Sequence, residues 1–456
     1  MSIQLSSWRW VAGALALVAG AVVAAPPEAP AEVAATQGGR AGDWPQWRGV
    51  NRDGVSLETD LLKKWPEGGP RLLWTMEGLG NGVAGVAVVG KRAYTIGGRG
   101  RDAMVMAFDL ETQKEIWSTP FATASGQGER ATPCVAGNRI FVMGAESTVA
   151  GLDAETGKLL WKKACRADLH GDMQHIYGYS ETPLVDGEMC IFTPGAKDAA
   201  IMAVNKDTGE VIWKMPMPNF SQKGPALASY SSLVISEACG IRQYVTLLGR
   251  GLVGVEAKTG KFLWGNDKIA IQHSNIPTPL VKGDYVWGSN GYGGGTVCLK
   301  LVRDTSPDGT TMPAGSAEGA AVDGVRIKVE EQYYLKPDVC ANQCGQSVML
   351  GDYVYTGHGQ YASEPMCLEW KTGKILWHDK QPGRGVAGLI AADGMLIFRA
   401  ESGDVSLVTT GPQGGEVVGN FKPVSKKASG LSPPVVAGGK LYLRDGNVLM
   451  CYDLRE

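Results

Sequence analysis

The sequence lacks several features that would place it in a common class of protein. Its 44 lysines and arginines almost balance its 46 aspartates and glutamates, which gives a formal net charge of −2. A nearly neutral chain offers no electrostatic footprint for nucleic acid, so we expect no nucleic-acid partner. The apolar run Val11–Ala24 is shorter than the ~20 residues that a membrane-spanning helix needs. We therefore expect no stable insertion into a membrane.

Motifs of familiar catalytic sites are also missing. The chain has no clear Ser-His-Asp order, no glycine-rich phosphate loop and no motif of paired carboxylates. Its nine cysteines include no adjacent pair. The sequence therefore predicts no catalytic residue.

The N-terminus is typical of an export signal. Arg9 precedes the apolar run, and small residues lead to Pro26-Pro27, which predicts a signal peptide over residues 1–24. Residues 25–42 are rich in Ala, Pro and Glu and are predicted to be a disordered leader. No cysteine lies near the cleavage site, so we expect no lipid anchor. We predict an exported, soluble protein in the periplasm or outside the cell.

The cysteines of an exported protein suggest disulfide bonds. Three of them, however, take a repeat position where other copies carry alanine or glycine, and these are predicted to be packing residues: Cys298, Cys367 and Cys451. Three others are predicted to lie in loops and are the better candidates for a bridge: Cys165, Cys340 and Cys344.

What the chain has in plenty is glycine, at 63 of 456 residues, and a repeat built on it. Asp153–Trp161 consists of an acidic strand end, Thr-Gly, and an apolar strand that ends in tryptophan. Glycine supplies the positive φ of a tight turn, so each copy predicts a β-hairpin. The same pattern recurs at residues 109–117, 205–213, 256–264 and 369–377.

A second recurring unit precedes each hairpin, for example Thr182–Gly187 followed by an aromatic strand. Four strands, A to D, thus recur about every 43 to 52 residues, which is the length of a propeller blade. Counting weak copies predicts an all-β, eight-bladed propeller over residues 43–456, with a flexible insertion at 304–324. Its ring would be closed by an N-terminal D strand, Pro70–Trp74. The tryptophans that end the D strands are predicted to dock blade to blade: Trp74, Trp117, Trp161, Trp213, Trp264 and Trp377.

Strand direction separates two faces of the predicted ring. The short A–B and C–D turns lie on a lower face, and the B–C and D–A loops lie on an upper face, where function is expected. The upper loops hold or adjoin all five histidines: His170, His175, His273, His358 and His378. Candidate sites are therefore expected on the upper face.

Residues just before the A strands are predicted to ring the upper mouth of the channel. This ring is suited to a polar or anionic ligand, although its groups would also serve simply to satisfy strand ends. It comprises Arg130, Tyr179, Glu181, Tyr230, Asn275, Gln346 and Arg384. Weak candidates for metal ligands share one upper loop, and their spacing is unspecific: His170, Asp172 and His175.

The Thr-Gly-x-x-x-Trp repeat resembles that of the quinoprotein, or PQQ-like, β-propellers. Asp43–Gly49 and Asn51–Ser56 look like the opening of a family of exported PQQ-like repeat proteins of planctomycete-type bacteria. Its members are often labelled as similar to the propeller lipoprotein of the barrel-assembly machinery. Where that family suggests a His-His-Gly-Gly stretch, this chain has Asn342–Gly345.

The resemblance also implies a cofactor site to test. Quinone dehydrogenases of this kind hold PQQ between a tryptophan and a vicinal Cys-Cys disulfide, with Ca²⁺ bound by Glu, Asn and Asp. Because this chain has no adjacent cysteines, we expect no cofactor, and PQQ with Ca²⁺ in particular is not expected.

The sequence thus favours an exported, monomeric and non-catalytic scaffold that binds a protein or a polar small-molecule ligand through its upper face. Two alternatives stay open. One is a PQQ-dependent oxidoreductase of the alcohol- or sugar-dehydrogenase kind, and the other is an outer-membrane protein assembly factor.

Overall fold

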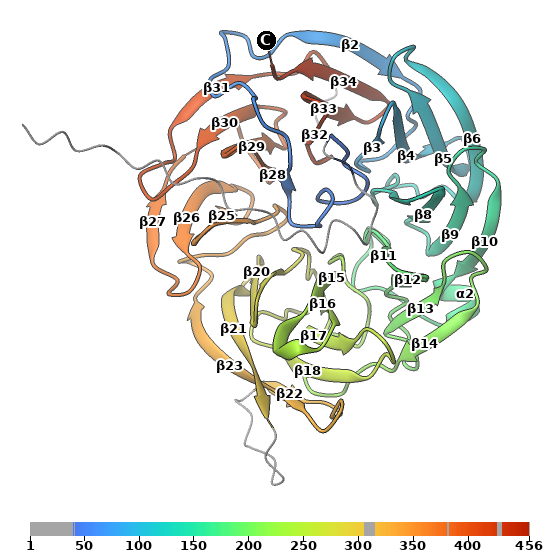
Figure 1. The fold of residues 1–456 in the computed structure, drawn as a ribbon, viewed down its shortest axis with the longest axis vertical. Coiled ribbons are helices and arrows are strands. Elements are labelled where there is room, and N and C mark those ends of the chain that lie inside the picture. The colour runs from blue at the N-terminus through green and yellow to red at the C-terminus, as the bar shows by residue number, and fades with distance from the viewer. Residues whose placement is uncertain (1–39, 41, 305–314, 381–382, 426–430, 456) are drawn as a thin grey trace, which may run out of the picture.

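The protein is a closed ring of eight β-sheets, in which every blade has four antiparallel strands (Figure 1). The computed structural model describes residues 40, 42–304, 315–380, 383–425 and 431–455. The prediction of an all-β, eight-bladed propeller is confirmed. None of the helices in these described residues is long and apolar enough to cross a membrane.

The first four blades follow one another along the chain, each running from the channel outward. Their strands are β3 (Ala87–Val89), β4 (Arg92–Arg99), β5 (Asp102–Asp109), β6 (Lys114–Thr123); β7 (Cys134–Ala136), β8 (Arg139–Met143), β9 (Thr148–Asp153), β10 (Leu159–Ala164); β11 (Leu184–Asp186), β12 (Met189–Phe192), β13 (Ile201–Asn205), β14 (Val211–Met215); and β15 (Val234–Ser236), β16 (Gln243–Leu248), β17 (Gly251–Glu256), β18 (Phe262–Asn266). Two short helices interrupt them, α2 (Cys165–Leu169) and η1 (Ala238–Gly240).

The last four blades include the segments that depart from the repeat. Their strands are β19 (Leu280–Lys282), β20 (Tyr285–Asn290), β21 (Gly295–Asp304), β23 (Arg326–Leu335); β24 (Val348–Leu350), β25 (Tyr353–His358), β26 (Glu364–Glu369), β27 (Ile375–His378); β28 (Ala387–Ala392), β29 (Met395–Ala400), β30 (Val405–Thr409), β31 (Val417–Phe421); and β32 (Val435–Ala437), β33 (Lys440–Asp445), β34 (Val448–Asp453). The eighth blade takes its outer strand from the N-terminal part of the chain, because β2 (Leu72–Glu77) pairs with β34.

Every outer strand carries a β-bulge at the same place. In β10, for example, Leu159 faces Leu152 and Trp161 faces Gly151, so that Leu160 has no partner in the ladder. A bulge bends an edge strand and re-aims the next side chain. The unpaired residues of the eight blades are Leu73, Ile116, Leu160, Ile212, Leu263, Gln332, Leu376 and Val418.

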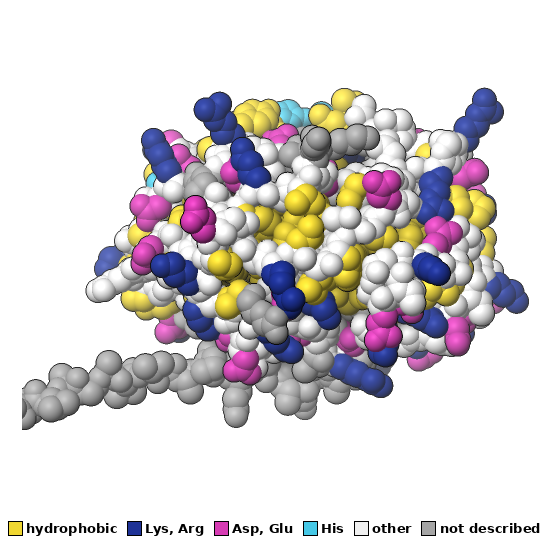
Figure 2. Space-filling view, turned by 90° about the horizontal axis from the view of Figure 1, so that it is seen from above, with side chains coloured by type: hydrophobic (Ala, Val, Ile, Leu, Met, Phe, Trp, Pro, Cys, Tyr) yellow, Lys and Arg dark blue, Asp and Glu magenta, His cyan; other side chains and the backbone are white. Residues whose placement is uncertain are grey.

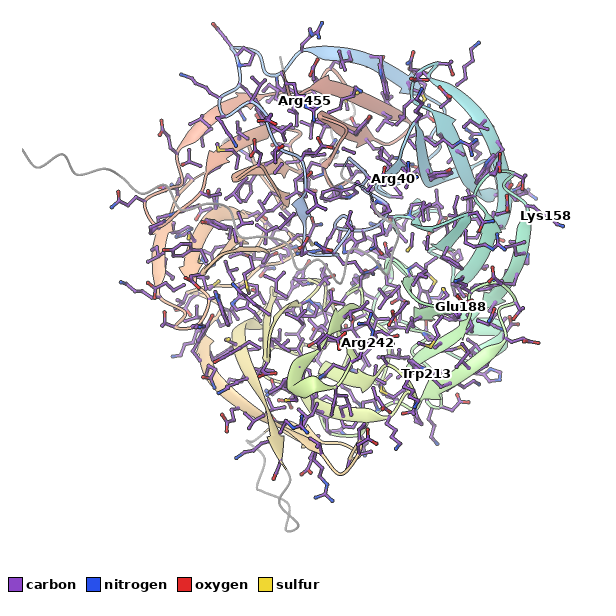
Figure 3. All side chains as sticks on the ribbon, in the orientation of Figure 1. Arg40, Lys158, Glu188, Trp213, Arg242 and Arg455 are labelled. Carbon is purple, nitrogen blue, oxygen red and sulfur yellow. The ribbon has the colours of Figure 1, made fainter. Side chains whose placement is uncertain are left out.

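The tryptophan that follows the bulge contacts the next blade through the Thr-Gly turn of that blade. The indole Nε1 of Trp161 donates to Lys206 O at 2.8 Å, and that of Trp213, on the outer strand of the third blade, donates to Ala257 O at 3.1 Å (Figure 3). The turn glycine lies against the ring, since a Cβ on Gly209 would stand 2.8 Å from Trp161. Its φ is also +73°, so glycine suits this position for two reasons.

Trp264 departs from this pattern because the C–D turn of the next blade is replaced by the insertion. Its Nε1 donates instead to Gln243 Oε1 of its own blade at 2.7 Å. Part of the insertion forms β22 (Ser316–Glu318), which pairs with β18 as a fifth strand of the fourth blade. The predicted flexible insertion at 304–324 did not anticipate this strand, and its residues 305–314 lie outside the described ones.

Candidate functional site

A non-repeating segment occupies the channel at the centre of the ring (Figure 1). We call residues 44–58 the channel segment. It starts at the lower face, where Asp43 Oδ1 accepts from Gly90 N in the first A–B turn, 2.8 Å away. It ends at the same face, where Glu58 accepts from Gly438 N at 2.7 Å, in the last A–B turn. The segment is therefore a loop inserted into the channel from below.

The channel segment contacts all eight blades at or just before their innermost strands. In blade order the hydrogen bonds run from Trp44 N to Val88 O (2.7 Å), Val135 N to Pro45 O (2.8 Å), Arg52 Nη2 to Thr182 O (2.8 Å), Arg52 Nε to Leu233 O (2.8 Å), Trp47 Nε1 to Thr278 Oγ1 (3.4 Å), Arg48 Nη2 to Ser347 O (2.5 Å), Ala391 N to Gly54 O (2.8 Å) and Ser56 Oγ to Val436 O (3.3 Å).

Two arginines of the segment make three of these eight hydrogen bonds, Arg48 and Arg52, and each is only 2% exposed. Their guanidinium groups donate to backbone carbonyls that the inner strands leave unpaired, which suits the five donors of the fork. Burial lowers the pKa of both to about 10, so both stay charged at neutral pH. Both residues have positive φ, 64° and 56°, a conformation that costs about 1–2 kcal/mol for a side chain with a Cβ.

The residues present do not fit a centre for PQQ and Ca²⁺. All nine cysteines are free, so no vicinal disulfide is available to carry the cofactor. Within the described part of the chain, no group of three or more His, Cys, Asp or Glu residues is arranged to hold a metal ion. Arg48 and Arg52 of the channel segment are already bound to the ring.

Four of the predicted mouth residues are buried and do not face the mouth: Tyr179, Glu181, Asn275 and Gln346. The Tyr179 hydroxyl donates to Pro194 O at 2.8 Å, and Asn275 Nδ2 donates to Leu248 O at 2.8 Å. Glu181 accepts from Thr193 N at 2.5 Å, and burial raises the pKa of this carboxyl to about 7. These groups satisfy backbone at strand ends, and Arg384 lies exposed nearer the seventh blade.

The other two predicted residues, Arg130 and Tyr230, belong to a group of side chains that we call the mouth cluster. The D–A loops before β7, β11, β15, β19 and β24 and two B–C loops bring it together on the upper face. Its members are Arg130, His175, Tyr177, Tyr230, His273, Tyr292, Gln343 and Tyr361.

The rings of the mouth cluster form a continuous row. Their centroid distances are 5.1 Å for Tyr177 to His175, 6.3 Å for His175 to His273, 5.0 Å for His273 to Tyr292 and 6.3 Å for Tyr292 to Tyr361. Neighbouring rings are tilted or edge-on, which is the favoured geometry of aromatic pairs. Gln343 ties the far end together, because its Nε2 donates to the Tyr292 hydroxyl at 2.7 Å and its Oε1 accepts from Tyr361 N at 2.7 Å.

Positive charge in the mouth cluster comes from Arg130. Its guanidinium lies 4.8 Å from the centroid of the Tyr177 ring and donates to Tyr177 O at 3.2 Å. His175 Nδ1 lies 3.1 Å from the Tyr230 hydroxyl. Burial and the neighbouring His273 lower the pKa of His175, so this ring is neutral at pH 7. Burial raises the pKa of Tyr230 to about 12, so its hydroxyl keeps its proton.

The end of the row nearest Arg130 and the opposite end are open to solvent. Tyr361 is 61% exposed, Tyr177 is 42% exposed, and the neighbouring Ile176 is 76% exposed. Seen edge-on, the ring carries histidine and hydrophobic side chains along its upper edge (Figure 2). Exposed aromatic and aliphatic groups gathered in one place are typical of an interaction surface. The sequence pointed to this face through its histidines, but the ring contacts depend on loop conformations that no periodicity reveals.

The three candidate metal ligands do not meet in this structure, and the three candidate cysteines form no bridge. Asp172 Oδ1 pairs with Arg166 Nε at 2.9 Å, His175 faces tyrosine rings, and His170 ends α2 in a left-handed conformation, so the three do not converge. All nine cysteines lie within the described residues and none forms a bridge. Cys165 and Cys340 are buried side chains of the interior.

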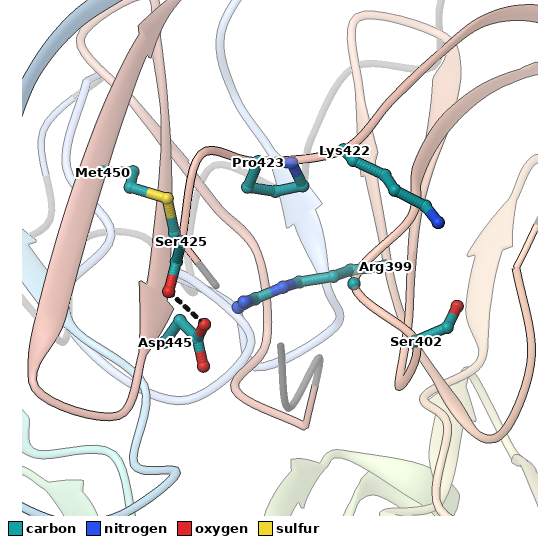
Figure 4. A pocket seen from close by; sticks show the side chains of 8 residues that line it. Arg399, Ser402, Lys422, Pro423, Ser425, Asp445 and Met450 are labelled. Carbon is teal, nitrogen blue, oxygen red and sulfur yellow. Dashed lines mark hydrogen bonds between the residues drawn. The ribbon is translucent and has the colours of Figure 1, made fainter. Parts of the chain in front are cut away.

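A second concavity lies between the seventh and eighth blades (Figure 4). Its volume of about 60 Å³ is enough for two water molecules and too small for a substrate. Arg399 crosses it and donates to Ser432 O at 2.9 Å, and Ser425 donates to Asp445. This pocket is lined by groups that join two blades.

Comparison with known proteins gives a family match over more than half of the chain. Residues 101–341 match the family model described as outer membrane protein assembly factor BamB. The chain is 26% identical over 208 residues to the outer membrane protein assembly factor BamB of Shewanella oneidensis, covering 43% of this chain and 49% of that protein. It is 31% identical over 106 residues to the quinoprotein alcohol dehydrogenase PedH of Pseudomonas putida, covering 23% and 17%. The chain thus spans at most about half the length of these relatives.

Solved structures share the fold. The quinohemoprotein alcohol dehydrogenase of Comamonas testosteroni superposes with a TM-score of 0.59 at 12% identity, covering 94% of this chain and 82% of that one. A europium-containing methanol dehydrogenase gives 0.51 at 13% identity, covering 90% of each chain. At these identities the likeness shows the propeller alone.

Proposed function

The chain belongs to the PQQ-like propeller family described as outer membrane protein assembly factor BamB, and from this premise we propose that it is a binding scaffold that captures a protein partner on its upper face. The observation that carries the proposal is the mouth cluster, an exposed row of tyrosine and histidine rings beside one arginine. Tyrosine and arginine are over-represented among the residues that dominate protein interfaces. The channel below is occupied by the chain itself, whose Arg48 and Arg52 bind the ring, so the mouth cluster offers a surface for a partner.

The family description and one of the two relatives named above support a protein partner. The S. oneidensis relative is named for outer-membrane protein assembly, and the matching family carries the same description. We propose that this protein works outside the cytoplasm, as a monomer, in that kind of assembly. The dehydrogenase alternative gains no support from the donor groups of the described residues, which do not converge on a metal site.

Site-specific photo-crosslinking in the native host tests the proposal. A crosslinking amino acid placed at Tyr177 or Tyr361 should yield a discrete protein adduct, identified by mass spectrometry as a component of outer-membrane protein assembly. The matched control is Ile212, which is 46% exposed on the outer rim and should give no such adduct. When the probe is at position 361, the additional substitution Tyr177→Ala should weaken the adduct several-fold.

Two outcomes would contradict the proposal. One is an adduct of equal strength from the rim position, and the other is no adduct from either mouth position in a protein that melts normally. Oxidation of alcohols or sugars with a dye acceptor after addition of PQQ and Ca²⁺ would favour the dehydrogenase instead.

A further inference from the structure

The channel segment contacts the ring as a bound ligand would, although it is covalently joined to it. The ring is closed without it, because β2 pairs with β34 outside the segment. The only strand within the channel segment is β1 (Val55–Ser56), which has two residues and pairs in parallel with β28. The rest is held by side chains and by carbonyls of the ring. Hydrogen bonds within the segment, such as Gly54 N to Arg48 O at 2.9 Å, make it a compact loop that docks on the ring.

We propose that the central channel is a peptide-binding site for a turn-forming segment with two arginines four residues apart, filled in this chain by residues 44–58. The class of ligand follows from the two sockets. Arg52 enters one lined by Thr182 O, Pro183 O and Leu233 O, and Arg48 enters the other, which ends at Ser347 O. Both sockets consist of carbonyl oxygens, which select a cation with several donors.

Shape adds to this selectivity. A Cβ on Gly54 would stand 2.9 Å from Val348, and one on Gly49 would stand 3.2 Å from the Trp44 ring. Gln46 accepts from Arg52 Nη1 at 2.8 Å and so fixes the second arginine from within the segment. The ring therefore selects two charges, their spacing and Gly54, while Gly49 allows close packing within the segment. A lysine would keep the charge but lose the planar fork.

The site is also connected to the upper face. Arg52 binds Thr182 and Pro183, which follow the loop that carries His175 and Tyr177. Arg48 binds Ser347, four residues after Gln343. Occupancy of the channel thus anchors the bases of two loops of the mouth cluster.

The mature chain can be nicked to test this. Gly68 offers a place for a protease sequence, because a Cβ added there would meet nothing within 4 Å, whereas Gly69 packs against Phe421. After cleavage of the folded protein, gel filtration should show the N-terminal fragment still bound to the ring of residues 69–456. A fluorescent peptide of residues 43–67 added in excess should then exchange into the ring, measured by anisotropy.

The control peptide carries Arg48→Lys and Arg52→Lys and should bind at least 10-fold more weakly. The proposal fails if the fragment separates from a ring that keeps its circular dichroism and melting temperature, or if both peptides exchange equally. Unfolding of the ring on nicking would also overturn it, because the segment would then be part of the fold and no ligand. Arg139 lies on the lower face. Arg139→Lys in the intact chain therefore shows the effect of replacing an arginine by lysine outside the channel.

Discussion

At the scale of single residues, buried arginines join parts of the ring that lie far apart in the sequence. Arg444 of the eighth blade donates to Ile96 O at 2.7 Å and to Leu79 O at 3.0 Å, both in or beside the first blade. Arg399 of the seventh blade donates to Arg444 O at 2.6 Å. None of the nine cysteines takes part in such a link. Hydrogen bonds from charged donors to backbone therefore carry the contacts between distant segments.

The buried carboxyl of Glu181 should make the stability of the protein depend on pH. Burial raises the pKa of its carboxyl from 4.5 to about 7 in the folded protein. Between these values the folded state binds more protons than the unfolded state, so stability falls as pH rises. Each pKa unit corresponds to 1.36 kcal/mol, so the loss attributable to this group is on the order of 3 kcal/mol between about pH 4.5 and 7.

The measurement is the difference in unfolding free energy between wild type and Glu181→Gln as a function of pH. The difference should change in favour of the glutamine variant as pH rises to 7. Glu188→Gln is the matched control, because the Glu188 side chain is 72% exposed, and it should leave the profile unchanged. A flat difference for Glu181→Gln would show that its carboxyl titrates as in water.

At the scale of elements, the bulge, the tryptophan and the turn glycine form one unit that joins neighbouring blades. Gly209→Ala should lower the unfolding free energy by about 3–4 kcal/mol, since it adds left-handed strain to a clash with Trp161. Gly187→Ala is the control for strain alone: its φ is +58° and an added Cβ would meet nothing within 4 Å. It should cost about 1–2 kcal/mol in the same urea titration. If both variants lose the same unfolding free energy, Gly209 has no packing role against Trp161.

This unit also explains how much the sequence could predict. The repeat specified the hairpins, the blade count and the position of Trp161, because each copy reports the same local geometry. Cys298, Cys367 and Cys451 are buried, as expected of packing residues. The strand in the insertion was harder to predict, because β22 forms by pairing with β18, which lies in the preceding blade.

The sites lie where repetition ends. The residues of the channel segment were recognised as a family opening, but nothing periodic tells that Arg48 and Arg52 enter the channel. Glu181 and Asn275 were placed at the mouth from their distance to an A strand, and local turns direct them inward instead. Arg130 and Tyr230 belong to the mouth cluster, but their aromatic neighbours come from loops far apart in sequence.

At the scale of the whole molecule, a ring of blades presents eight outer strand edges on which other chains could pair. Several are blocked locally. Pro120 interrupts β6, Pro216 follows β14, and in β10 the N–H of Ala164 donates to Asp168 Oδ2 at 2.8 Å. The edge of β18 has no such residue and is covered by β22. Leu263 is accordingly 1% exposed, while its counterpart Ile212 is 46% exposed.

Ala317→Pro should therefore promote the formation of dimers through this edge. Ala317 faces Gly265 in the ladder between β22 and β18, and proline there removes a donor and releases the strand. The uncovered edge would present Leu263 and unpaired backbone groups, which a second copy can satisfy in the same way. Light scattering after gel filtration should show dimers of the variant that increase with concentration. Glu318→Ala keeps the backbone ladder but removes the contact to Arg326, 3.1 Å away, and should remain monomeric. If Ala317→Pro also stays monomeric, the bulge at Leu263 alone is enough to protect this edge, and β22 serves only to join the fourth blade to the fifth.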